Sequence, residues 1–433
     1  MEKGKESLLF AKIFKTDINL KRCYIWNGIA GLINASEAVI VQMIVTRTMS
    51  LEDAGIVTIA FATANLLVTV GKFGMRNFQA TDTNNKYKFS SYFLSRVMTV
   101  IIMGVIALWY AAFGILHNAY SIYKAEVIML ICMIYMIESV EDVFWGLYQQ
   151  KGRLDVGGKI FTIRWSVLLI VFSSVVLVTR NLVLALSGAL LASIIVEVAL
   201  LSVTRMILDE KTDYRECFPN CLSLLKECFP LFLSGFLNFY IINAAKFAID
   251  FFLVDEVQAC YGFVAMPVFA IGLLSSFMYQ PILTQMALEW KEGNKKGLLR
   301  RIYRQLLIIL GLLIICELGA YFVGIQCLSW LYNTDLNAYK EILMILLLGG
   351  GMLAIAEFQA IILIIMRCRK EQMAAYVSSA MVASMASPLL VKEYAVKGAA
   401  VSYLLSVSVL VFLLGIFVIK MMALPGKQNR YSC

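Results

Sequence analysis

Charged residues are scarce in this sequence. Only 15% of its 433 residues are charged, whereas 61% are hydrophobic. A soluble protein of this size covers its exterior with many more charged side chains. The composition therefore excludes a soluble globular protein, and no hydrophilic stretch is long enough to form a separate soluble domain.

Candidate catalytic and metal-binding residues are also scarce. The sequence has one histidine, His117, with no evident catalytic partner. Cys217, Cys221 and Cys228 lie close together, but this group lacks the fourth ligand that a structural zinc site needs. We therefore expect no metal ion, no cofactor and no enzymatic activity.

Long apolar runs recur from one end of the chain to the other. A run of about 20 apolar residues is typical of a transmembrane helix. The sequence therefore predicts an all-α integral membrane protein. Its twelve transmembrane helices are expected at roughly residues 24–46, 54–75, 91–115, 124–148, 158–179, 181–204, 223–250, 257–285, 302–322, 338–366, 371–391 and 396–420.

The distribution of positive charge predicts the topology of these spans. Lys and Arg concentrate in the cytoplasmic loops of membrane proteins. With a cytoplasmic N-terminus and twelve spans, most of the 38 Lys and Arg residues fall in cytoplasmic segments. The outer loops then contain only Arg47, Lys124, Arg180, Lys340, Lys392 and Lys397. We therefore expect both termini to be cytoplasmic.

The hydrophilic segment 205–222 lies near the midpoint of the chain, with six predicted spans on each side. Transporters are often built from two such repeats, with the substrate site between them near the middle of the membrane. The sequence therefore predicts two six-span repeats with one central polar site. We expect an N-terminal lobe at 1–208, a cytoplasmic linker at 209–222 and a C-terminal lobe at 223–433.

Charged residues within the predicted spans are candidates for a functional site. Lys246 and Asp250 lie four residues apart in the seventh span, so they share a helix face and can form a pair. Each charge at bilayer depth costs at least about 2.5–3.5 kcal/mol, and a buried pair adds little net stability. This favours a polar cavity that also includes Asn243, although an inert structural pair is the alternative. Glu37 and Glu317 are further carboxylates deep within spans.

Other charged residues lie closer to the predicted ends of their spans. Arg96 and Arg164 can either line a cavity or extend to the inner headgroups. For several acidic residues, we expect placement at the membrane interface without a function: Glu138, Glu141, Asp142, Glu197 and Glu357. The triplet Gly349–Gly351 within the tenth span permits close helix packing or bending.

Four stretches of the chain carry a resemblance to a known family. They are "VTRTMSLEDAGIVTIAFATANLLVTVGKFGMRNFQATD" (45–82), "NAAKFAID", "VQACYGFVAMPVFAIGLLSSFMYQPIL" and "EWKEGNKKGL". In these stretches the sequence resembles bacterial polysaccharide-repeat flippases, of the superfamily that includes the multidrug exporters (MATE) and the lipid-linked oligosaccharide exporters.

The resemblance implies two six-helix bundles that form a V-shaped central cavity in the bacterial inner membrane. It also implies a transporter that moves an undecaprenyl-pyrophosphate-linked sugar repeat from the cytoplasmic to the outer leaflet for surface polysaccharide biosynthesis. The implied partners are the lipid-linked oligosaccharide, membrane lipids and other polysaccharide-assembly proteins. Nucleic acid is not expected, because the basic residues form no single stripe.

An anionic pyrophosphate needs cationic contacts along a polar path. The candidates within spans are Lys246, Arg96 and Arg164, with Arg47 and Arg76 at the ends of the first two spans. On this hypothesis, Asp250 holds Lys246 while the cavity is empty.

Coupling to H⁺ or Na⁺ would require a buried carboxylate. Glu37, Asp250 and Glu317 are the candidates.

Two other functions remain as alternatives. A MATE-type, cation-coupled exporter of drugs or small amphipathic molecules would share the fold, but acidic residues would be expected to dominate its cavity. A membrane glycan polymerase or ligase would need catalytic groups on the outer side, where the sequence has no large loop.

Overall fold

The structure is a computed structural model that describes residues 20–82, 86–204 and 217–423. All regular secondary structure in these three ranges is helical, as predicted. The residues group into two compact units, 1–236 and 237–433. The two units are described separately below.

The boundary between the units differs from the predicted linker at 209–222. It lies within α9 (Cys217–Phe252), which is one continuous helix. Residues 209–216 lie outside the described part of the chain, and residues 217–222 are already helical. The first half of α9 therefore belongs to unit 1. The bounds of the two predicted lobes stay a prediction.

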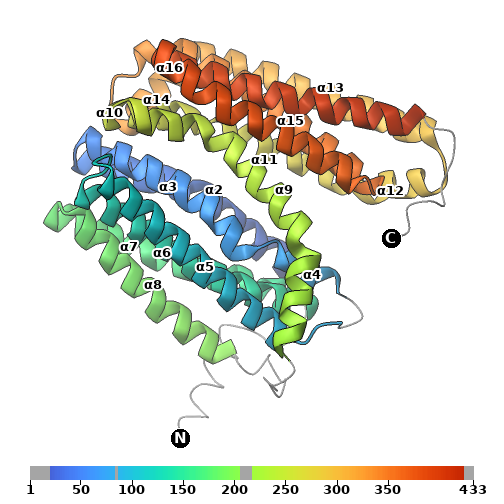
Figure 1. Ribbon diagram of the computed structural model, residues 1–433, viewed down its shortest axis with the longest axis horizontal. Helices are drawn as coiled ribbons and strands as arrows, with labels where there is room; N and C mark the ends of the chain where they lie inside the picture. The colour runs from blue at the N-terminus through green and yellow to red at the C-terminus, as the bar shows by residue number, and fades with distance from the viewer. Residues whose placement is uncertain (1–19, 83–85, 205–216, 424–433) are drawn as a thin grey trace, which may run out of the picture. The chain divides into compact units, whose positions relative to one another are not determined.

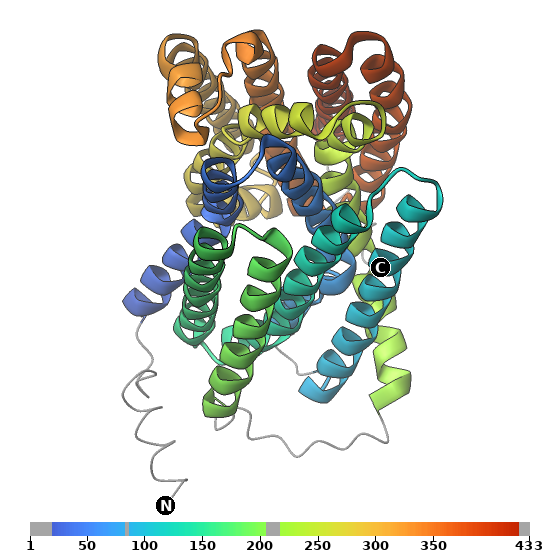
Figure 2. The same ribbon diagram turned by 90° about the vertical axis from the view of Figure 1, so that its left-hand side faces the viewer.

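Unit 1 is a bundle whose helices, coloured blue to green, run alongside one another (Figure 2). α6 packs against α3, α5, α7 and α8, and α2 packs against α7. Together with the first half of α9, the unit contains α2 (Leu20–Thr48), α3 (Leu51–Lys72), α4 (Met75–Thr81), α5 (Phe89–Leu116), α6 (Ile122–Gln150), α7 (Leu154–Thr179) and α8 (Leu182–Thr204).

Unit 2 is a second bundle, in which α15 packs between α13 and α16 (Figure 1). Together with the second half of α9, it contains α10 (Asp255–Ala265), α11 (Val268–Tyr279), α12 (Leu283–Lys291), α13 (Lys295–Gly319), α14 (Ile325–Tyr332), α15 (Lys340–Ile365) and α16 (Arg369–Ala423). Short turns of 3₁₀ helix lie at Gln280–Ile282 and Asn337–Tyr339, and a turn of π-helix at Ala320–Gly324 joins α13 to α14.

The predicted spans all coincide with helical segments. Among the described residues, ten helices are long and apolar enough to cross a membrane, so the chain is a multi-pass membrane protein. α6 is not one of the ten, because charged residues occur along its length: Lys124, Glu126, Glu138, Glu141 and Asp142. α16 counts once although it consists of two arms. The number twelve therefore stays a prediction.

The two arms of α16 meet where the sequence predicts a break between spans. Ala395 has a non-helical backbone with φ 49°. Gly398 follows, and a Cβ atom there would lie 1.9 Å from the Leu390 carbonyl oxygen. Only glycine therefore allows the second arm to approach the first so closely.

The glycine triplet of α15 serves close packing, because α15 continues as a regular helix through it. A Cβ atom would lie 2.5 Å from the Tyr403 ring at Gly349, 2.8 Å from Val268 at Gly350 and 2.5 Å from Leu313 at Gly351. α16, α11 and α13 thus each approach the backbone of α15 at one glycine.

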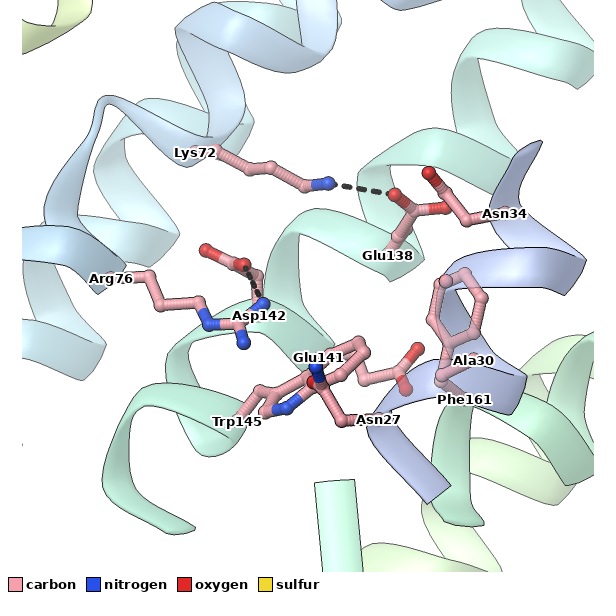
Figure 3. A pocket seen from close by; sticks show the side chains of 11 residues that line it. Asn27, Ala30, Asn34, Lys72, Arg76, Glu138, Glu141, Asp142, Trp145 and Phe161 are labelled. Atoms are coloured by element: carbon pink, nitrogen blue, oxygen red, sulfur yellow. Dashed lines mark hydrogen bonds and ion pairs between the residues drawn. The ribbon is translucent and has the colours of Figure 1, made fainter. Parts of the chain in front are cut away.

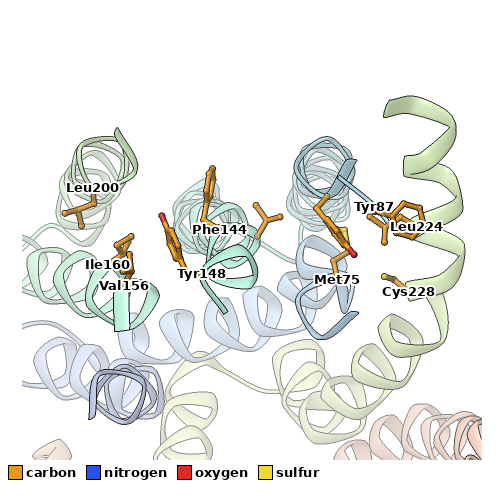
Figure 4. Close-up of a cluster of buried hydrophobic side chains, with 11 residues drawn as sticks. Met75, Tyr87, Phe144, Tyr148, Val156, Ile160, Leu200, Leu224 and Cys228 are labelled. Atoms are coloured by element: carbon orange, nitrogen blue, oxygen red, sulfur yellow. The ribbon is translucent and has the colours of Figure 1, made fainter. Parts of the chain in front are cut away.

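A cluster of buried apolar side chains joins the first half of α9 to unit 1. Leu224 and Cys228 of α9 are part of this cluster, which extends through Met75 to Tyr148 of α6 (Figure 4). The Phe232 ring also stacks on Phe73, with the ring centroids 4.3 Å apart. These contacts explain why half of α9 groups with unit 1.

The turn from α3 to α4 depends on a glycine. Phe73 and Gly74 both have left-handed backbones, with φ 48° and 65°. A Cβ atom on Gly74 would lie 2.9 Å from the Cβ of Leu231 in α9. Gly74 therefore allows both the turn and the contact with α9.

We predict that Gly74→Ala lowers the free energy of unfolding by about 2 kcal/mol or more, because left-handed strain of about 1–3 kcal/mol is added to a clash. Gly152→Ala adds the backbone strain without a clash, since Gly152 has φ 70° and no atom lies within 4 Å of its added Cβ. This variant therefore measures the strain alone. Gly28→Ala, in an exposed helix with equally open space, should be neutral or stabilising. Thermal unfolding in detergent should rank the variants in this order, and a Gly74 variant as stable as the Gly28 variant would contradict the packing described.

Candidate functional site

Four polar or aromatic residues lie on one face of α6. Glu138, Glu141, Asp142 and Trp145 are spaced i, i+3, i+4 and i+7, which places them on the same side of a helix. All three carboxylate residues are buried, with relative exposures of 2–6%. The opposite side of α6 carries apolar residues such as Val143 that belong to the core of unit 1.

α2 presents a face with the same spacing. Asn27, Ala30, Gly31 and Asn34 are again i, i+3, i+4 and i+7, with two amides at the ends and two small residues between them. The small residues leave space beside α6. A cavity of about 230 Å³ results, lined by Asn27, Ala30, Gly31, Asn34, Lys72, Arg76, Glu138, Glu141, Asp142, Trp145 and Phe161 (Figure 3).

Two cations reach this cavity from either side of the Phe73–Gly74 turn. The Lys72 ammonium lies 2.7 Å from Glu138 Oε1, and Arg76 Nη1 lies 3.7 Å from Asp142 Oδ1 (Figure 3). Their side chains are 32% and 27% exposed. We call Lys72 and Arg76 the rim cations.

Arg76 also packs on an aromatic ring of the cavity. Its guanidinium carbon lies 4.2 Å from the centroid of the Trp145 ring, which is cation–π geometry. Burial lowers the pKa of the Arg76 guanidinium, and the charge of Asp142 partly offsets this. A guanidinium nevertheless stays protonated at physiological pH.

Behind the cavity, Arg96 of α5 is fully buried. Its Nη2 lies 2.8 Å from Asp142 Oδ2, and its Nη1 donates to the Gly71 carbonyl oxygen at 2.7 Å. Asp142 is therefore shared between a buried arginine and the rim cation Arg76.

Arg164 of α7 is the second fully buried arginine. It lies 2.7 Å from Glu141, 3.7 Å from Glu197 and 3.8 Å from Glu138. It also donates to Ser193 Oγ at 3.3 Å. Glu138 is therefore shared between Arg164 behind the cavity and Lys72 at its rim.

The result is a two-layer arrangement of charge. The outer layer contains the rim cations, the inner layer contains Arg96 and Arg164, and the carboxylates lie between. A ligand anion can attract Lys72 or Arg76 without leaving Glu138 or Asp142 unpaired. This matters because a buried charge that loses its only partner costs about 3–5 kcal/mol.

Glu37 lies one helical turn beyond Asn34 on α2 and does not line the cavity. It is 3% exposed and accepts a short hydrogen bond from the Tyr135 hydroxyl. Its other oxygen, Oε2, has no hydrogen-bond partner within the described ranges. Ion coupling by Glu37 stays a prediction.

Several expectations for unit 1 need correction. Arg96 and Arg164 neither extend to headgroups nor line this cavity, because carboxylates of neighbouring helices enclose them. The acidic residues expected at the membrane interface are buried within the bundle, and their depth in the membrane stays a prediction. The i, i+3, i+4 spacing in "ESVEDVFWG" is the signal that would have identified this face. The buried acidic residues are Glu138, Glu141, Asp142 and Glu197.

The other candidates are distributed over both units. Arg76 lines the cavity of unit 1, and Arg47 is exposed in the last turn of α2. In unit 2, α13 carries Glu317, which is half-buried and lies three residues before the start of the turn of π-helix. Binding of a substrate or an ion by any of these residues stays a prediction.

The polar residues of the seventh predicted span lie in the half of α9 that belongs to unit 2. Asn243 is 4% exposed and donates to the Phe239 carbonyl oxygen at 3.0 Å. Lys246 and Asp250 are half-buried one turn apart. Within the described residues no salt bridge joins these two side chains, so the predicted hold of Asp250 on Lys246 is not seen in this conformation.

The family of the chain follows from its sequence match. A family model described as "Polysaccharide biosynthesis protein" matches residues 20–287, which is more than half of the chain. The chain belongs to this family. No curated protein sequence matches the chain significantly.

Solved structures of transporters share the fold of this polysaccharide biosynthesis protein. The lipid II flippase MurJ, in an inward closed conformation, has a TM-score of 0.71 at 13% identity, over 92% of this chain and 89% of MurJ. An inward-facing multidrug MATE transporter of the MOP superfamily has a TM-score of 0.68 at 11% identity, over 92% and 98% of the two chains. The predicted resemblance to MATE-like polysaccharide flippases is confirmed.

A third structure is described in terms of its binding pocket. It is a MOP superfamily transporter from Pyrococcus furiosus, for which "reverse polarity of binding pocket" is reported. Its TM-score is 0.61 at 12% identity, over 93% of this chain and 94% of that one.

We predict that Arg164→Met lowers the free energy of unfolding by about 3–5 kcal/mol, because it leaves buried carboxylates without their cation. Arg76→Met should cost about 1 kcal/mol or less, since Asp142 keeps Arg96. The double variant Arg164→Met, Glu141→Gln should recover part of the loss by removing one uncompensated charge. Thermal unfolding in detergent measures all three. Equal losses for Arg164→Met and Arg76→Met would contradict the two-layer arrangement.

Proposed function

We propose that this protein flips an undecaprenyl-pyrophosphate-linked oligosaccharide repeat from the cytoplasmic to the outer leaflet of a bacterial inner membrane, for surface polysaccharide biosynthesis. The observation that carries the proposal is the pair of rim cations, Lys72 and Arg76, at a polar cavity in a member of the polysaccharide biosynthesis protein family. Each rim cation shares a carboxylate with a buried arginine, so each is available to an anionic ligand.

The proposed topology has twelve spans, with α6 and the two arms of α16 each counted as spans. Both termini, which lie outside the described residues, are cytoplasmic in this topology. The cavity then lies towards the cytoplasmic side of unit 1, where α3 and α6 end and α7 begins. This is the side from which a newly made lipid-linked repeat must enter.

The size of the cavity restricts what part of the substrate it holds. Pockets for drug-sized ligands are about 300–1,000 Å³, and this cavity is about 230 Å³. It therefore accommodates the pyrophosphate and adjoining sugar atoms, not a whole oligosaccharide. Asn27 and Asn34 supply amide groups for sugar hydroxyls, and the polyprenyl tail stays in the lipid.

Binding of the pyrophosphate proceeds as an exchange of partners. Phosphate oxygens replace Glu138 and Asp142 as the partners of Lys72 and Arg76. The two carboxylates keep their contacts with the buried arginines Arg164 and Arg96, so no charge is left uncompensated.

Other candidate residues have separate roles in this proposal. Lys246, Asn243 and Arg47 supply later polar contacts along the path. Coupling uses H⁺ or Na⁺ at Glu37, Asp250 or Glu317, and no organic cofactor is needed. Other polysaccharide-assembly proteins deliver and use the substrate.

One observation favours a second function, export of cationic drugs in the manner of a MATE transporter. Three carboxylates of α6 line the cavity, against two cations. A cationic ligand would bind Glu138 or Glu141 and displace Lys72 outward. The variants below distinguish the two functions.

We predict that the double variant Lys72→Ala, Arg76→Ala reduces export at least tenfold. Each charge-assisted hydrogen bond to the substrate contributes about 1.5–3 kcal/mol to its binding. Accumulation of lipid-linked repeats and loss of surface polysaccharide measure the effect. Lys88→Ala, Lys226→Ala is a matched control, since both lysines are exposed residues of unit 1. Normal polysaccharide together with changed export of a cationic dye would instead support the second function.

We also predict that Lys246→Ala abolishes export while the protein stays folded in the membrane. Lys246 is half-buried in a predicted span, where a charge without a functional contact is costly. Lys246→Arg, which keeps the charge, should retain most of the export. Full surface display by the alanine variant would remove Lys246 from the path.

A further inference from the structure

The first three turns of α13 carry five basic residues, of which two are engaged within unit 2. The Lys295 ammonium donates to the Met422 carbonyl oxygen at 2.9 Å. Arg301 Nε lies 2.7 Å from Glu289 Oε1 of α12. These contacts connect α13 to α16 and to α12.

The other three basic residues form one exposed face. Lys296, Arg300 and Arg304 are spaced i, i+4 and i+8, so they lie above one another along the helix. All three are exposed, and none has an ion-pair partner in the part of the chain that the structure describes. We call these three residues the basic face of α13.

The basic face is unfavourable for an isolated helix. Like charges at i and i+4 destabilise a helix by about 0.2–0.5 kcal/mol per pair. The first acidic residue of α13 is Glu317, which is more than three turns beyond Arg304. A countercharge from outside the chain would remove this repulsion.

Apolar residues next to the basic face indicate where it lies. Leu299, Tyr303 and Leu307 alternate with the cations and are 56%, 64% and 50% exposed. Beyond them the fully exposed residues of α13 are apolar and include Leu310, Ile314 and Leu318, while Glu317 is half-buried. The surface thus changes from mixed to apolar along one helix, as expected where a helix passes from lipid headgroups into hydrocarbon.

We propose that the basic face of α13 is a binding site for the phosphate-bearing headgroups of anionic phospholipids. Lys296, Arg300 and Arg304 supply the charge, and the interleaved Leu299, Tyr303 and Leu307 contact the upper acyl chains. A nucleic acid or an acidic protein would leave these apolar side chains in water. The proposal is independent of what the protein transports.

Lipid retention by the purified full-length protein tests the site. Native mass spectrometry should detect phosphatidylglycerol on the wild type, and retention should fall as salt screens the charges. A triple variant of the basic face, Lys296→Gln, Arg300→Gln, Arg304→Gln, should bind phosphatidylglycerol with an affinity lower on the order of a hundredfold. Each basic residue near an anionic surface contributes about fivefold to this affinity. Retention of phosphatidylcholine should not change.

Two further variants separate a site from general positive charge. The first is a control triple variant that removes three exposed basic residues at the turn between α15 and α16: Arg367→Gln, Arg369→Gln, Lys370→Gln. It should lower phosphatidylglycerol retention less than twofold. Lys296→Arg, Arg300→Lys, Arg304→Lys keeps the charge and should retain the lipid. An equal loss in the control triple, or no loss in the basic-face triple, would overturn the proposal. If the variant with three glutamines does not fold, two other measurements still test the proposal. These are the salt dependence of phosphatidylglycerol retention by the wild type and the retention by the variant that keeps all three charges.

Discussion

The structure of unit 1 depends on carboxylates that are each held between a buried arginine and a more exposed cation. Asp142 lies between Arg96 and Arg76, and Glu138 lies between Arg164 and Lys72. Buried charges in a membrane protein need partners, and the inner arginines supply them permanently. The outer cations are therefore free to change partners, which is the property that an anion-binding site in a membrane requires.

The backbone of unit 1 explains why these charges meet. The left-handed turn at Phe73 and Gly74 places Lys72 and Arg76 on the same side of α6. Matching faces of α2 and α6, with Ala30 and Gly31 between two asparagines, leave the cavity open. Small residues at the helix contacts thus determine both the packing and the position of the charges.

The sequence predicted the helices well and the site only in part. Apolar runs of sufficient length identified helical segments throughout the described residues, and the predicted break between the last two segments is found at Ala395. Glu138 and Asp142 were judged by their depth in a single span, which could not show that cations of other helices surround them. Their partners come from α3, α4, α5 and α7, so only tertiary packing reveals the pairs. The regular spacing in "ESVEDVFWG" was the part of this information that the sequence contained.

The most direct test of the account is an experimental structure of the protein with a pyrophosphate-linked lipid bound. The account predicts phosphate oxygens within hydrogen-bond distance of Lys72 and Arg76, with Lys72 moved away from Glu138. The contacts of Arg96 with Asp142 and of Arg164 with Glu141 should remain as they are in the present structure. A bound pyrophosphate with Lys72 still on Glu138, or a pyrophosphate held directly by Arg96 or Arg164, would contradict it.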